Sequence, residues 1–182
     1  QQQRPQGQRP QGQFGQRPQG QRPQGQRPQG QRPQGQRPQG GGFQLPAGWA
    51  DGFMNTLIKD IITMVDANYR TIADSEHRAM AGLSMGGMET KNITLARPEV
   101  FGSYGLMSGG TYAPADIKSK DQVDLIFMSA GSKENPDAVN KAAADLKAAG
   151  HNAVSYVSEG TAHEFLTWRR SLYQMAQLLF KK

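Results

Sequence analysis

The sequence predicts an α/β fold in which helices flank a parallel sheet, preceded by a long repetitive segment. After residue 42, apolar runs of strand length alternate with amphipathic stretches of helical length, which is typical of parallel sheets with helices on their faces. A serine, a glutamate and a histidine (Ser84, Glu134 and His163) each follow a predicted strand. Reactive groups collect at the carboxyl ends of parallel strands, so this placement supports both the fold and a site at that edge.

Residues 1–42 are repeats of Gln-Arg-Pro-Gln-Gly, interrupted once by Phe14 and Gly15. They contain seven arginines, seven prolines and no acidic residue. Proline every five residues excludes a helix, and one large apolar side chain cannot offset the entropy of ordering the segment. We therefore expect a disordered linker. The alternative is that the arginines bind a polyanion such as an acidic polysaccharide.

The remaining residues, 43–182, have fourteen basic and fifteen acidic side chains, so the overall charge of +6 belongs to the repeats. The high isoelectric point therefore does not predict a nucleic-acid partner. No run of 18 apolar residues occurs, and we expect no membrane partner. The chain has no cysteine and only three scattered histidines, which do not suggest a metal site. Residues 43–182 suffice for one core and are predicted to form one domain.

The first predicted helix covers residues 52–69, where apolar residues recur at helical spacing. A short buried strand over 77–83 then leads into Ser84, and a helix over 86–96 is stopped by Pro98. The expected apolar face of the first helix, over 52–69, consists of Phe53, Leu57, Ile61 and the pair Met64 and Val65.

Two more strands, over 101–107 and 124–130, precede a helix that opens at Asn135 and Pro136, with asparagine as cap and proline in the first helical position. Gly150 closes that helix, and a strand over 153–157 follows. A terminal helix is predicted over 164–180. It is expected to bury Phe165, Leu172, Met175, Leu178 and Leu179.

Ser84 lies in Gly-Leu-Ser-Met-Gly, between a predicted strand and a predicted helix. A G-x-S-x-G sequence at such a turn exposes the nucleophilic serine of α/β-hydrolases. The backbone N–H of Met85 would then donate to the oxyanion, and Gly86 and Gly87 would allow a sharp turn and close helix packing. The structural alternative is that Ser84 only caps a helix.

The acid Glu134 and then His163 follow Ser84, which is the chain order of the α/β-hydrolase triad. His163 would accept the Ser84 proton and return it to the leaving group, while Glu134 would hold the imidazole in the productive tautomer. Asp137 is the alternative acid, although its place in a first helical turn suits it to offset the helix dipole.

The other candidates are weaker. His77 and His151 precede strands and so belong to the opposite edge of the sheet. Trp168, in the terminal helix, is interpreted as a core residue rather than a platform for substrate.

Three segments resemble one family. Residues 81–87, Ala-Gly-Leu-Ser-Met-Gly-Gly, are similar to the serine elbow of the esterase-D-like esterases of the α/β-hydrolase superfamily, which include the carbohydrate esterase family 1 feruloyl and acetylxylan esterases. Residues 131–134 resemble the family's G-x-x-D/E acid turn. Residues 160–165, followed by Trp168, resemble its G-x-x-H-[DE]-F-x-x-W segment.

The resemblance implies a secreted or cell-surface serine esterase that cleaves feruloyl or acetyl esters of plant polysaccharide through an acyl-enzyme, without a cofactor. Such esterases take part in xylan degradation, and a xylanase or other module fused upstream would be a partner.

The resemblance covers the C-terminal portion only, roughly residues 50–182. Family members carry several strands before the helix that leads to the serine, and an early loop supplies the second oxyanion donor. Residues 1–42 occupy that place here, so we expect missing N-terminal strands, an exposed edge at the serine strand and a rate lowered by about 10²–10³-fold. The alternative is a catalytically incomplete remnant, or an interaction protein whose basic repeat binds polyanions.

Overall fold

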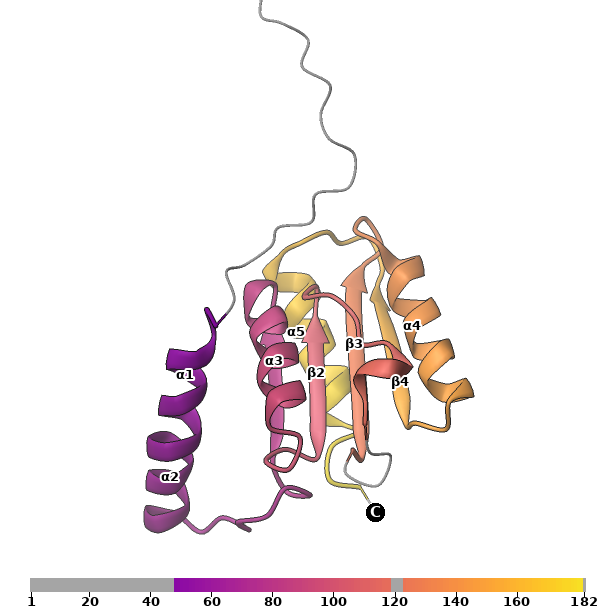
Figure 1. Cartoon of the computed structure of the whole chain (residues 1–182). Helices are drawn as coiled ribbons and strands as arrows, with labels where there is room; N and C mark the ends of the chain where they lie inside the picture. Colours follow the sequence, from indigo (N-terminus) through magenta and orange to yellow (C-terminus); the bar gives the residue numbers. More distant parts are fainter. Residues whose placement is uncertain (1–47, 119–122, 182) are drawn as a thin grey trace, which may run out of the picture. The chain divides into compact units, whose positions relative to one another are not determined.

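The computed structural model describes residues 48–118 and 123–181 (Figure 1). Residues 1–42, for which we expect either a linker or a polyanion-binding segment, lie outside the described residues. Within the described residues, four strands form one parallel sheet in the order β1-β2-β3-β4. The strands are β1 (Ala79–Leu83), β2 (Ser103–Met107), β3 (Leu125–Gly131) and β4 (Ala153–Ser158).

Helices cover both faces of this sheet, as the alternating sequence pattern predicts. α3 (Met85–Ala96) packs on β1 and β2, and α4 (Pro136–Ala148) packs on β3 and β4. α5 (Phe165–Ala176) lies on the opposite face, behind the sheet in Figure 1. Asn135 caps α4 by accepting from the N–H of Ala138, so the predicted start of this helix is confirmed.

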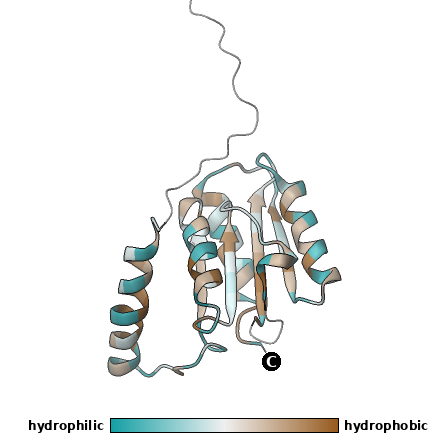
Figure 2. Cartoon of the chain, in the orientation of Figure 1, coloured by the Kyte–Doolittle hydropathy of each residue, from teal (hydrophilic) through white to brown (hydrophobic). Residues whose placement is uncertain are grey.

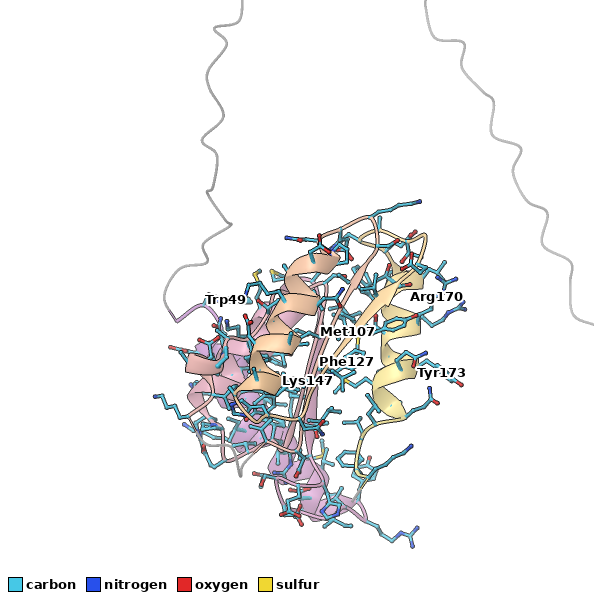
Figure 3. All side chains as sticks on the ribbon, turned by 90° about the vertical axis from the view of Figure 1, so that its right-hand side faces the viewer. Trp49, Met107, Phe127, Lys147, Arg170 and Tyr173 are labelled. Atoms are coloured by element: carbon cyan, nitrogen blue, oxygen red, sulfur yellow. The ribbon has the colours of Figure 1, made fainter. Side chains whose placement is uncertain are left out.

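The central strands β2 and β3 are buried along their whole length, as expected where both faces of a parallel sheet are covered. Their side chains alternate between two apolar clusters, one on the α3 and α4 face and one on the α5 face. Met107 and Phe127, labelled in Figure 3, belong to the second cluster, which also contains Met175 of α5.

β1 differs from the buried strand that the sequence predicts. It is an edge strand of the described sheet, and its residues are half-buried or exposed. Leu83 is 39% exposed and lines an apolar hollow beside α5, and among the described strands only β2 pairs with β1. The predicted exposed edge at the serine strand is therefore present in the described residues.

The first helix is interrupted by a π-helical turn. α1 (Asp51–Thr56) runs into π-helical Leu57–Ile61, which continues as α2 (Ile62–Asn68). A π turn adds a residue to the helical repeat, so the side chains that reach the core cluster are Met54, Leu57 and Ile62. Phe53, Ile61 and Met64 are exposed, and their predicted burial is wrong. Figure 2 shows hydrophobic and hydrophilic residues on different sides of this segment.

The terminal helix is shorter and less buried than predicted. α5 ends at Ala176. Met175 is buried and Leu179 packs partly against the core, but Phe165, Leu172 and Leu178 are exposed. Phe165 and Leu172 line an apolar cavity of about 480 Å³ together with residues of β1, so the side of α5 near the sheet edge has nothing in the described residues to pack against.

In residues 48–118 and 123–181, no helix combines the length and the apolar character that crossing a bilayer requires.

Candidate active site

Ser84 stands at the turn between β1 and α3, with a backbone conformation that few serines adopt. Its φ of 54° and ψ of −118° lie outside the region that L-residues prefer. The Ser84 N–H donates to Met107 O at 2.9 Å, which fixes the turn to the neighbouring strand. This strained strand-to-helix turn is the geometry expected of a nucleophile elbow.

Glycines allow the two sides of the elbow to approach each other. A Cβ on Gly82 would collide with the Gly86 carbonyl, and one on Gly87 would lie 2.7 Å from the Gly109 Cα. A Cβ on Gly86 would meet nothing within 4 Å. The close packing predicted for Gly86 and Gly87 is therefore provided by Gly82 and Gly87 instead.

The loops that follow β3 and β4 are tied together. Ser132 N–H donates to Ser158 O, Lys133 N–H donates to Thr161 O, each at 3.0 Å, and Gly160 N–H donates to the Ser132 hydroxyl at 2.9 Å. These bonds hold the turn carrying Glu134 against the loop carrying His163.

The three predicted side chains meet at the carboxyl edge of the sheet. His163 Nε2 lies 2.7 Å from Ser84 Oγ, and His163 Nδ1 lies 2.8 Å from Glu134 Oε1. Ser84 and Glu134 are 50 residues apart in the chain, yet the His163 imidazole hydrogen-bonds to both. This arrangement can move a proton from the hydroxyl to the imidazole while the carboxylate stabilises the resulting positive charge.

The environment of Glu134 keeps it ionised. Burial raises the pKa of the Glu134 carboxyl, but the N–H of Gly131, the His163 imidazole and the Ser108 hydroxyl all bond to the carboxylate. Together these hydrogen bonds outweigh burial, so the pKa lies below its ordinary value of 4.5. A charged carboxylate at neutral pH is the form that can orient and stabilise an imidazolium.

Met85 is the first residue of α3. The first N–H groups of a helix have no acceptor within the helix, so the Met85 N–H is available to a negatively charged oxygen near Ser84. Its role as oxyanion donor stays a prediction, as does the expected loss of a second donor.

The other predicted residues fall outside this cluster. Asp137 is exposed in the first turn of α4, and it is Glu134 that contacts His163. His77 pairs with Asp74 before β1, and His151 is buried before β4, both at the opposite edge. No group of three metal-ligating side chains occurs among the residues that the structure describes.

Two further residues belong to the site. Ser108 follows β2 and donates from its hydroxyl to Glu134 Oε2 at 2.8 Å, and Trp168 Nε1 donates to Ser108 Oγ at 3.0 Å. Sequence analysis missed Ser108, although its place just past a predicted strand could have indicated it. Trp168 packs partly in the core, as predicted, but its ring also meets the His163 ring edge-on at 5.2 Å.

Serine hydrolases of the α/β class join a hydroxyl, an imidazole and a carboxylate in this order at the edge of a parallel sheet. Residues 23–179 match the model of the Esterase family, described as "Putative esterase". The chain therefore belongs to this esterase family of carboxylic ester hydrolases.

A relative and two solved structures give the context. The chain is 60% identical over 132 residues to an endo-1,4-beta-xylanase/feruloyl esterase of Xylanibacter ruminicola, covering 72% of this chain and 18% of that protein. A feruloyl esterase module from Clostridium thermocellum complexed with sinapinate is 20% identical, with a TM-score of 0.59 over 72% of this chain and 59% of the other. For a CE1 ferulic acid esterase from Anaeromyces mucronatus in complex with ferulic acid, the identity is 17% and the TM-score 0.56, over 71% and 54%. At these identities the two structures share the fold.

Proposed function

We propose that this chain hydrolyses carboxylic esters, with Ser84 as nucleophile, His163 as general base and acid, and Glu134 as the group that orients the imidazole. The unbroken series of hydrogen bonds from Ser84 Oγ through His163 to Glu134, with 2.7 and 2.8 Å between the bonded atoms, carries this proposal. Serine hydroxyls become nucleophilic only beside such a base.

In this mechanism His163 Nε2 takes the Ser84 proton as Oγ attacks the ester carbonyl carbon. The carbonyl oxygen becomes an oxyanion, to which the Met85 N–H donates. The intermediate then expels the alcohol, which receives the proton from His163, and the acyl group stays on Ser84. Water, deprotonated by His163, then attacks the acyl carbon of this acyl-enzyme. As the bond from the acyl carbon to Ser84 Oγ breaks, His163 returns the proton to Oγ and the acid is released. No cofactor is needed in any of these steps.

We infer that the substrates are feruloyl or acetyl esters of plant polysaccharide. The relative's name joins a xylanase to a feruloyl esterase, which supports a xylan-linked ester and a xylanase or other module as partner in a longer chain. Because such polysaccharides lie outside the cell, we propose a secreted or cell-surface location. The domain boundary at residue 43 is part of the same proposal.

The test is turnover of p-nitrophenyl acetate and methyl ferulate by the chain, compared with its Ser84→Ala variant. We expect hydrolysis that falls to background in Ser84→Ala, and labelling by a fluorophosphonate that Ser84→Ala abolishes. Ser155→Ala, in the middle of β4, is the matched serine control and should label normally. Activity that survives Ser84→Ala would refute the assigned nucleophile.

A chain that neither labels nor turns over ester would support the other proposal, a catalytically incomplete protein that works through its basic repeat. The exposed edge of β1 favours that second candidate. It predicts salt-sensitive binding of a polyanion such as heparin, which removal of residues 1–42 would abolish.

A further inference from the structure

The Glu134 carboxylate is held from two sides, and only one of them is His163. Oε1 faces His163 Nδ1, whereas Oε2 accepts from the Gly131 N–H at 2.6 Å and from the Ser108 hydroxyl at 2.8 Å. A carboxylate bound at one oxygen can rotate about its last torsion, which is broad for glutamate. Bonds at Oε2 therefore determine whether Oε1 stays directed at the imidazole.

The backbone of Ser108 places its hydroxyl for this contact. Ser108 follows β2 directly and has a φ of 52°, an uncommon value for a residue with a side chain. Its N–H donates to Ser129 O on β3 at 2.8 Å, which anchors the turn to the sheet. Ser84 has nearly the same φ, 54°, at the end of the adjacent strand, so two neighbouring strand ends present a serine hydroxyl to the same imidazole–carboxylate pair.

Trp168 determines which way the Ser108 hydroxyl points its proton. An indole N–H can only donate, and a hydroxyl has a single proton to give. Because Trp168 Nε1 donates to Ser108 Oγ, the Ser108 proton is free to go to Glu134 Oε2. The same indole meets the His163 ring at an angle of 89°, so Trp168 contacts both the imidazole and the residue that supports its carboxylate.

We propose that Ser108 and Trp168 are positioning residues for the esterase reaction. The Trp168 N–H orients the Ser108 hydroxyl, which fixes Glu134 and thereby keeps the Nδ1 proton of His163 on the carboxylate side and Nε2 free for Ser84. This inference rests on the proposed function and adds two residues that act through Glu134 and the His163 ring rather than on the ester itself.

Loss of either group should affect the chemical step more than substrate binding. We expect Ser108→Gly to lower kcat about tenfold to a hundredfold, the range of one hydrogen bond to a charged group. Trp168→Phe removes a bond between two neutral groups and should lower kcat about twofold to tenfold, with KM changed by less than about twofold in both variants. Glycine is chosen at residue 108 because it accepts a positive φ without strain, so a loss of activity reports the missing hydroxyl. Ser155→Ala is the matched control and should retain both kinetic constants.

Proton NMR gives a readout that a purely structural role would not move. We expect a strongly downfield His163 Nδ1 proton in the full chain and in Ser84→Ala, which lacks the nucleophile but keeps the Glu134 contact. That resonance should broaden or vanish in Ser108→Gly and Trp168→Phe and persist in Ser155→Ala. Circular dichroism melting identifies any variant that fails to fold, in which case the other positioning variant decides the outcome.

The two proposals can fail separately. Activity that survives Ser84→Ala contradicts the proposed function. A folded Ser108→Gly or Trp168→Phe chain that retains the downfield resonance, or an unchanged kcat, overturns the positioning role even where Ser84 is essential.

Discussion

At the scale of single residues, the site depends on which carboxylate reaches the imidazole. The sequence offers Glu134 and Asp137, three residues apart, and chain order alone does not choose between them. The choice is made by the turn after β3, where Gly131 approaches Thr161 so closely that a Cβ at residue 131 would collide with the Thr161 carbonyl. That approach sets Glu134 beside His163 and leaves Asp137 to begin α4.

Replacing each acid by its amide tests this choice. Glu134→Gln should lower kcat by about 10³–10⁴-fold, because a neutral amide no longer fixes the tautomer or stabilises the imidazolium. Asp137→Asn, three residues away and exposed, should leave kcat unchanged. Steady-state hydrolysis of p-nitrophenyl acetate measures both, and a larger loss in Asp137→Asn would show that the acid is misassigned.

The lowered pKa of Glu134 also links stability to pH. The folded chain holds this proton less tightly than the unfolded chain, so the carboxylate contributes stability that is fully present above its ordinary pKa of 4.5. That contribution is lost as the pH falls through the lowered folded pKa. We expect the difference in unfolding free energy between the natural chain and Glu134→Gln to be larger at pH 7 than at pH 3, as measured by urea denaturation. A difference independent of pH would contradict this linkage.

At the scale of elements, the crossing of α3 over the strand ends requires specific glycines. Gly87 meets Gly109 across this contact, whereas Gly86, one residue earlier, has open space around its α-carbon. Adjacent glycines in the same helical turn therefore have different structural roles, which the sequence pattern does not reveal.

Replacing each of these glycines with alanine separates packing from helix propensity. Gly87→Ala should destabilise the chain by about 1–3 kcal/mol, because the new methyl group overpacks a backbone contact. Gly86→Ala should be neutral or stabilising by up to about 1 kcal/mol, since alanine favours a helix over glycine. Thermal or urea unfolding of the two variants gives the comparison. Equal effects would mean that the α3 crossing can relax.

The sequence pattern predicts the position of an element correctly where that position depends on local chemistry. The strands β2 and β3 and the start of α4 at Asn135 follow from apolar runs and capping residues, and all three are confirmed. Predictions that depend on distant neighbours were wrong. The burial of Phe165 and Leu172 and of the strand before Ser84 depends on which elements pack against them, which apolar runs do not specify, and the π turn at Leu57–Ile61 has no signal in helical spacing. Ser108 was missed because its partners, Glu134 and Trp168, come from 26 and 60 residues away.

At the scale of the whole molecule, the β1 edge of the described sheet is the more consequential of its two edges. β1 exposes its outer side beside an apolar cavity whose lining includes Leu83, Phe165 and Leu172. Exposed apolar patches and unpaired strand edges both favour association with other chains. The chain spans 18% of its Xylanibacter ruminicola relative and 54–59% of the two solved esterases.

We therefore expect this chain to self-associate through the face that joins β1 and α5. Leu172→Glu places a charge in the apolar cavity, where the leucine is 55% exposed, and should weaken association without lowering the unfolding free energy. Tyr173→Glu is the matched control, because Tyr173 is 65% exposed on the same helix and lines a different surface together with Arg170 (Figure 3). Sedimentation velocity over a concentration series, with binding of a hydrophobic dye as a second readout, distinguishes the two variants. If both variants associate as strongly as the natural chain, or if Tyr173→Glu alone weakens association, the contact surface lies elsewhere on the molecule.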